Sequence, residues 1–151
     1  MSNFDEKTVD RIKRLDREVE RLRVKESGKF IALTTPLTST AWDGDAHSSE
    51  SATKLDMSSV FTGYPTTAIK AVLLRIASRD SAAVGTTGLE FSVGPAAGFP
   101  RVHRTIPVGG DVIASSLAIV PCDAAGDIYY YIAASGTNTL DAWIEVWGYW
   151  L

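Results

Sequence analysis

The sequence predicts a mainly β protein, with an antiparallel β-sandwich or jelly-roll-like domain at residues 29–151 and an N-terminal α-helix at residues 1–28. Two observations lead to this fold class. The first 28 residues carry 15 of the 33 charged residues of the chain and contain no Gly or Pro before Gly28. The rest consists of short runs of β-branched and aromatic residues separated by Gly, Pro and Ser, which is typical of antiparallel strands joined by turns.

The N-terminal segment has the start and stop signals of one helix. Ser2 is a suitable N-cap, and Asp5 completes a weak capping box. Gly28 supplies a natural end. Four apolar residues follow a heptad pattern within it, with Ile12 and Val19 at position a and Leu15 and Leu22 at position d. We therefore expect a parallel coiled coil with these residues at its interface.

The flanking charges support the same register. In a parallel coiled coil, position g of one chain faces position e of the next heptad on its neighbour. The resulting pairs are Phe4 with Val9, Arg11 with Asp16, and Glu18 with Arg23. One pair is apolar and two are opposite in charge, which favours in-register association of identical chains.

The heptads leave alternatives open. Ile and Val at position a with Leu at position d favour two strands on the usual rules, so two and three chains both remain. The helix could instead pack on its own β-domain. Binding to a membrane surface is disfavoured, because residues 1–28 hold eight bases and seven acids around a narrow apolar face.

The β-domain is expected to contain about eight strands. Pro36 should end the first, the segment 37–42 alternates weakly, and 43–52 reads as a polar loop. On periodicity alone 68–79 fits a helix or a strand, and its β-branched content favours a strand. The expected strands are residues 30–33, 53–57, 68–79, 89–93, 102–106, 112–120, 128–133 and 141–150.

The C-terminal strand is apolar on both faces. Alternation places Trp143, Trp147 and Tyr149 on one face, and the small and aliphatic residues from Ala142 to Gly148, with Trp150, on the other. Each aromatic side chain covers about 150–250 Å². A strand with two such faces needs cover on both, and we expect a neighbouring subunit to cover one. A larger core within the chain is the alternative.

Composition argues against several classes of protein. Residues 29–151 hold seven bases and eleven acids without a basic cluster, so no nucleic-acid partner is expected. The sequence has no apolar run of 18 residues and no signal-peptide pattern, which predicts neither membrane insertion nor secretion. The single Cys122 excludes an intrachain disulfide framework. We expect folding and assembly in a cytoplasm.

Residues that could carry chemistry are few. The motifs of a nucleophile elbow, a phosphate loop and a zinc protease are all missing, so we expect a non-enzyme without cofactors. Asp43 and Asp45 are weak candidates for Ca²⁺ ligands, although a solvated turn is the simpler interpretation. A small polyanion site at Arg101 and His103 is a second weak candidate, and residues 129–131, three tyrosines, fit a sugar-stacking surface less well than core packing.

Three runs give the chain a family resemblance. They are KAVLLRIASRDS at 70–81, GTTGLEFSVGP ending at Pro95, and IYYYIAASGTNTLDAWIEVWGYWL at 128–151. In pattern, residues 37–151 resemble β-domains of small structural proteins from tailed bacteriophages and prophages. That resemblance implies a virion component that follows a short coiled coil and closes as a homotrimer around a threefold axis.

Three functions are compatible with this resemblance and with the residues. The first is a homotrimeric tail or head fibre, docked on other virion proteins by its helix and exposing the β-domain to a host-surface receptor such as a glycan. In that case the loops 43–52, 81–88 and 94–101 should lie at the end distant from the helix. The second is a capsid decoration protein, and the third is a carbohydrate-binding module with no role in a virion.

Overall fold

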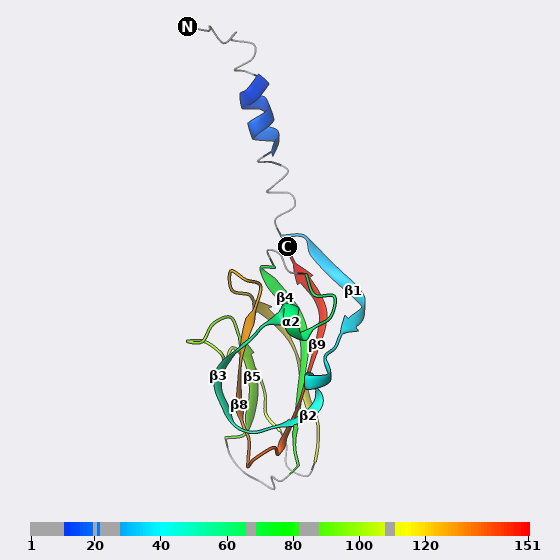
Figure 1. Cartoon of the computed structure of the whole chain (residues 1–151), viewed down its shortest axis with the longest axis vertical. Helices are drawn as coiled ribbons and strands as arrows, with labels where there is room; N and C mark the ends of the chain where they lie inside the picture. The colour runs from blue at the N-terminus through cyan, green and yellow to red at the C-terminus, as the bar shows by residue number, and fades with distance from the viewer. Residues whose placement is uncertain (1–10, 20, 22–27, 66–68, 82–87, 108–110) are drawn as a thin grey trace.

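The structure is a computed structural model that describes residues 11–19, 21, 28–65, 69–81, 88–107 and 111–151. Figure 1 shows the described part of the N-terminal helix and a β-domain built of two layers. Residues 11–19 are helical, and we call them the arm helix. The predicted pair Phe4–Val9, together with Leu22 and Arg23, lies outside the described residues.

Nine strands form two antiparallel sheets in the described part of the β-domain. Sheet A has the order β1-β9-β4-β7, and β2 also pairs with β9. Its strands are β1 (Phe30–Leu37), β2 (Asp43–His47), β4 (Ala71–Asp80), β7 (Ala114–Pro121) and β9 (Leu140–Trp150). Sheet B has the order β3-β8-β5-β6. Its strands are β3 (Glu50–Leu55), β5 (Glu90–Gly94), β6 (His103–Thr105) and β8 (Ile128–Ala133).

The two sheets enclose one hydrophobic core. Sheet A contributes every second residue of its central strands, and sheet B does the same from the other side, as expected for strands with one buried face. From sheet A come Val72, Leu74, Ile76, Val120, Ile144 and Val146, and from sheet B come Phe91, Val93, Ile128, Tyr130 and Ile132. Trp42, from the short 3-10 helix η1 (Thr40–Trp42), stacks on Phe91 in the same core.

The prediction of a mainly β domain is confirmed, and most strands lie where the sequence placed them. The ambiguous segment 68–79 contains the strand β4, which begins at Ala71 and pairs with β7 on one side and β9 on the other. Its inward residues Val72, Leu74 and Ile76 are fully buried, so period-two burial decides the type of element.

Three local predictions were wrong. The first strand continues past Pro36 to Leu37, because a bulge between Ala32 and Leu37 takes the proline out of the ladder. The segment 43–52 is no loop, since it contains β2 and the start of β3. The strand expected at 53–57 ends at Leu55, after which Asp56 caps the short helix α2 (Met57–Val60) by accepting a hydrogen bond from the Ser59 amide at 3.0 Å.

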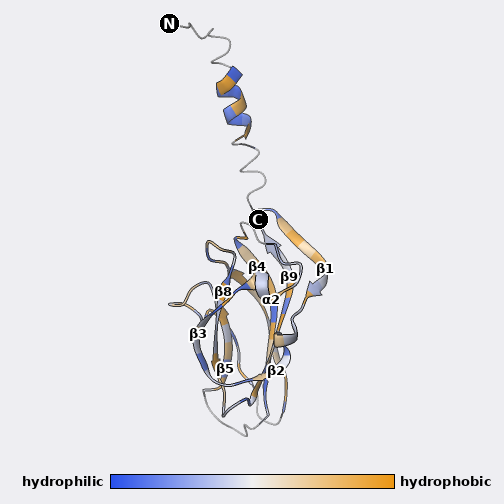
Figure 2. Ribbon diagram, viewed as in Figure 1, coloured by the Kyte–Doolittle hydropathy of each residue, from blue (hydrophilic) through white to orange (hydrophobic). Residues whose placement is uncertain are grey.

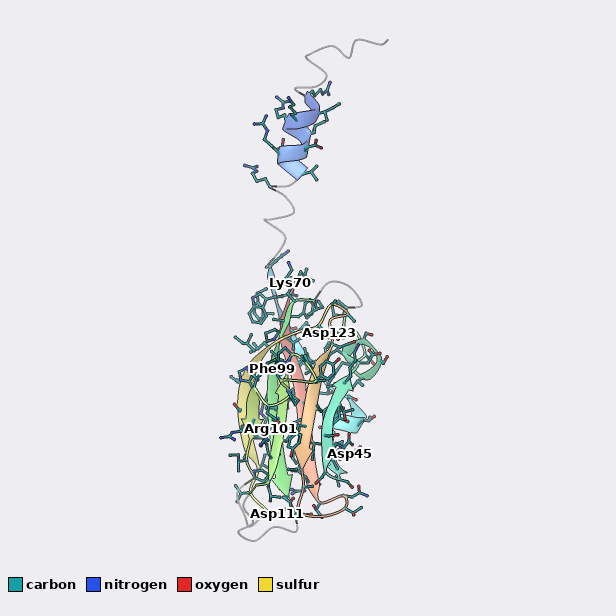
Figure 3. All side chains as sticks on the ribbon, turned by 90° about the vertical axis from the view of Figure 1, so that its left-hand side faces the viewer. Asp45, Lys70, Phe99, Arg101, Asp111 and Asp123 are labelled. Carbon is teal, nitrogen blue, oxygen red and sulfur yellow. The ribbon has the colours of Figure 1, made fainter. Side chains whose placement is uncertain are left out.

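The register of the strands defines two ends of the β-domain. At the arm end, Ala71 faces Trp150 and the chain enters at Gly28; at the distal end, Leu140 faces both Asp80 and His47. Figure 3 shows Lys70 and Asp123 towards the arm end and Asp111 at the distal end. The sheets therefore run lengthwise between the point where the arm enters and a set of turns at the opposite end.

Candidate assembly surfaces

The arm helix exposes its apolar stripe. Ile12, Leu15 and Val19 are 48%, 51% and 48% exposed, and Figure 2 shows apolar and charged residues alternating along this helix. The predicted interface charges Arg11, Asp16 and Glu18 are exposed as well. These side chains are therefore available to another chain.

The arm joins the β-domain beside the C-terminus. The Gly28 amide donates to the Leu151 carbonyl oxygen at 2.6 Å, and the Leu151 amide donates to the Lys29 carbonyl at 3.1 Å. Gly28 has φ +100°, a backbone conformation that favours glycine, whereas the predicted end of the helix before it lies outside the described residues. Phe30 then packs on Trp150 with ring centroids 4.4 Å apart. The residues where the β-domain begins and ends are thus both fixed to sheet A.

The C-terminal strand β9 changes faces at Trp147. Up to Val146 the predicted alternation holds, with Ile144 and Val146 fully buried and Trp143 facing outward. Between the partners of Leu73 and Leu74, however, β9 has one extra residue, Trp147, which forms a β-bulge. A bulge of one residue reverses the alternation after it.

The reversal corrects the predicted position of Tyr149. This residue pairs with buried Val72, packs against the core and contacts Tyr64 edge to face at 6.2 Å between ring centroids. Gly148 and Trp150 lie on the outer face instead, the first beside Leu73 and the second beside Ala71. Trp147 and Trp150 therefore remain as outward aromatic residues near the arm end, whereas Tyr149 packs against the core of its own chain.

Trp143 is partly covered within the chain. A Cβ atom at Gly44 of β2 would lie 2.7 Å from Trp143 Cζ2, so only glycine allows this close approach. The Arg79 guanidinium lies 5.9 Å from the Trp143 ring centroid. The prediction that β9 needs cover on both faces is thus met on the inner face by the core, and on the outer face only in part.

The strands beside β9 carry further exposed apolar residues that the sequence did not single out. Leu117 and Ile119 of β7 are 68% and 53% exposed. They pair with Arg75 and Leu73 of β4, so all four point to the outside of sheet A. We use the name outer face of sheet A for this surface, which consists of Leu73, Arg75, Leu117, Ile119, Trp147 and Trp150. Alternation in 112–120 was the signal that could have found Leu117 and Ile119.

The charges on this outer face are paired within the chain. Arg75 Nη1 donates to Glu145 Oε1 at 2.6 Å, and Trp147 Nε1 donates to the other oxygen of Glu145 at 2.9 Å. Farther towards the distal end, Arg79 binds Asp141 and also reaches Asp111 at 3.3 Å. The pairing leaves the face close to neutral.

The chain covers the outer side of β5 in sheet B. The segment after β5 turns back over this strand. It comes so close that a Cβ at Gly94 would lie only 1.8 Å from the Phe99 carbonyl oxygen. Arg101 follows, forms a two-pronged ion pair with buried Glu90 and stacks 4.8 Å from the Tyr131 ring centroid. Its hydrogen bonds hold the pKa of the Glu90 carboxyl below the usual value.

These contacts correct two predictions. Arg101 is occupied by Glu90, and His103 Nε2 is 2.9 Å from the Ile119 carbonyl oxygen, so the two do not form a common anion site. The loop 94–101 starts at the arm end, where Gly94 pairs with Tyr129, and not at the distal end. Figure 3 shows Phe99 nearer the arm than Arg101. Residues 82–87 of the loop 81–88 lie outside the described residues.

The weak metal candidates are exposed. Asp43 and Asp45 both lie on β2, where they pair with Trp143 and Ala142. Across the described ranges, no three His, Cys, Asp or Glu side chains are grouped so that they could hold a metal ion. His47 of β2 stacks on Trp42 at 4.6 Å between ring centroids. Of the three tyrosines, Tyr130 is buried in the core and its hydroxyl donates to Glu50 at 2.5 Å.

Comparison with known proteins gives no relative. No protein-family model matches the chain, and no curated protein or solved structure is significantly similar to it. Within the described part of the chain, none of the helices is long and apolar enough to cross a membrane.

Proposed function

We propose that this chain is a non-enzymatic structural protein of a tailed-bacteriophage virion, a homotrimeric fibre or appendage attached through its N-terminal helix. The observation that carries the proposal is the exposed stripe of Ile12, Leu15 and Val19 on the arm helix, about half accessible on each residue. Apolar residues at positions a and d associate with the same positions on other helices. We propose a virion role and three chains because residues 37–151 resemble phage β-domains.

The shape of the β-domain agrees with an appendage that is held at one end. The arm enters beside Leu151, whereas the turns around Ser48 and Asn138 lie at the distal end. There the Asn138 amide donates to Ser48 Oγ at 3.0 Å, and the Ser135 amide donates to Asp80 Oδ2 at 3.0 Å. These bonds fix the distal turns, which is the property that a receptor-binding tip requires.

The native mass tests the trimer. We expect light scattering to give a mass near 49 kDa, three times the 16.3 kDa of the chain, without change on dilution. Leu15→Asp should lower this mass while the unfolding free energy of the β-domain changes by less than about 0.5 kcal/mol. Arg17→Asp is the matched control, because Arg17 lies at the outward position f. A monomeric wild-type protein would contradict the proposal.

The virion assignment has a separate test. Antibodies against the β-domain should label phage particles produced by the strain that encodes the chain, at the tail or at the head vertices. Uniform labelling of the capsid surface would favour the decoration alternative. Particles that lack the chain altogether would remove the virion role.

A further inference from the structure

We propose that the outer face of sheet A is the surface through which the β-domains of three copies of this chain pack on one another. The inference rests on the proposed homotrimer and extends it from the arm to the β-domain. The face of one chain packs on the same face of the second and third copies. Leu73, Leu117 and Ile119 lie at the centre of this contact.

Exposed apolar side chains on β7 point to this face. Of the large hydrophobic residues exposed in the described part of the chain, two, Leu117 and Ile119, belong to the outer face of sheet A. Leu117 and Ile119 stand side by side on the outward side of β7 and are among the most exposed of them. Together with Trp147 and Trp150 they form an aromatic and aliphatic surface across three strands, and such a surface marks an interaction site.

The charged side chains on and beside the face are paired within the chain. Arg75 is satisfied by Glu145, and Arg79 by Asp141 and Asp111. A face whose charges are already paired does not repel an identical face, and it can be covered without leaving a buried charge unpaired. A nearly neutral face fits a second copy of the same chain. A strongly charged partner would meet no opposite net charge on it.

Part of the face lies next to the arm. Trp150 faces Ala71 and Gly148 faces Leu73 at the arm end, where Ile119 also pairs with Leu73, whereas Leu117 lies level with Arg75. The ion pairs at Arg75 and Arg79 follow towards the distal end. The arm itself enters sheet A through β1. In-register helices would bring the same rows of three sheets to one level, so the apolar stripe of the arm would continue into the face.

The experiment compares full-length variants by light scattering over a dilution series. The double variant Leu117→Glu with Ile119→Glu should raise the concentration at which the trimer dissociates by at least about a hundredfold, roughly tenfold for each side chain that loses its cover. Both residues are exposed, so the circular dichroism spectrum should not change. Ser51→Glu, an exposed position on β3 of sheet B, is the matched control and should leave the dissociation unchanged.

A spin label gives a second measurement that does not depend on weakening the face. A nitroxide on Ser115→Cys, an exposed residue of β7, should show dipolar broadening that disappears when labelled chains are diluted with unlabelled ones. The same label on Ser51→Cys should give no broadening. Cys122 reacts slowly at neutral pH, because burial raises the pKa of its thiol to about 11.

The outcomes separate the two proposals. A monomeric wild-type protein would overturn both. The inference alone would be overturned by three results together: Leu15→Asp dissociates the trimer, the double variant Leu117→Glu with Ile119→Glu does not, and the label on Ser115→Cys gives a sharp spectrum. The homotrimer would then stand, and the face would bind a different protein.

Discussion

Sheet A and sheet B treat their outer faces differently. On sheet B, the segment from Gly94 to Arg101 folds back over β5, and Glu90, Ser92 and Gly94 are all buried. On sheet A, Leu117 and Ile119 stay open to solvent. The chain thus covers β5 of sheet B, whereas on sheet A it covers Trp143 in part and leaves β7 open. This contrast is the reason why we propose the outer face of sheet A, and not that of sheet B, as the surface for a partner.

The largest effect on stability should come from removing β9, which carries core residues on one face and outward aromatic residues on the other. Deleting residues 143–151 takes away Ile144 and Val146 from the core and leaves β1 and β4 without their shared partner. We expect no cooperative thermal transition by circular dichroism. Deleting residues 1–27 is the control and should keep the transition. If the truncated domain still melts cooperatively, β9 is not needed for the core of the fold.

A smaller effect should follow from opening the cover of sheet B. In Gly94→Val, the new side chain meets the Phe99 carbonyl oxygen, so the covering segment must move. We expect a loss of about 2–4 kcal/mol in the free energy of unfolding by urea. Gly98→Ala is the matched control within the same segment, because a Cβ there meets nothing within 4 Å. Equal stability of the two variants would mean that the cover is loose.

The smallest effect should be the pH dependence of the same cover. Arg101 lowers the pKa of Glu90 below its usual value of 4.5 in the folded chain. The pair therefore stabilises the fold above the unfolded pKa, and this contribution disappears as the pH falls through the lower folded pKa. Urea unfolding of Glu90→Gln should show a flatter decline between neutral pH and about pH 3 than the wild type. Parallel curves for the two proteins would argue that the ion pair adds nothing to stability.

The strands were readable from the sequence because burial on one face imposes a period of two. This applies to β4, β8 and the first half of β9, whose inward residues are buried one after another. The reading failed at β2, since the DGDAH segment has no apolar alternation and is held by backbone pairing to β9 with Gly44 at positive φ. Pairing of that kind depends on a distant strand and leaves no local pattern.

The candidate interface was only partly readable. The heptad stripe of the arm is visible in the residue spacing, and Ile12, Leu15 and Val19 are exposed as that pattern requires. The faces of β9 were predicted with the wrong phase after Trp147, because a bulge adds one residue without any change in composition. Tyr149 was therefore assigned to an interface although it contacts Tyr64 in its own chain.

The pairing of β1 with β9 at the arm end of the β-domain has a mechanical consequence. The arm continues directly into β1, whose residues Phe30, Ile31 and Ala32 pair with Trp150, Tyr149 and Gly148 of β9. A pull on the arm along the strand direction therefore loads this ladder in shear, so its hydrogen bonds share the force instead of opening one after another. Tension would pass into β9 and from there into β4, the two strands at the centre of sheet A.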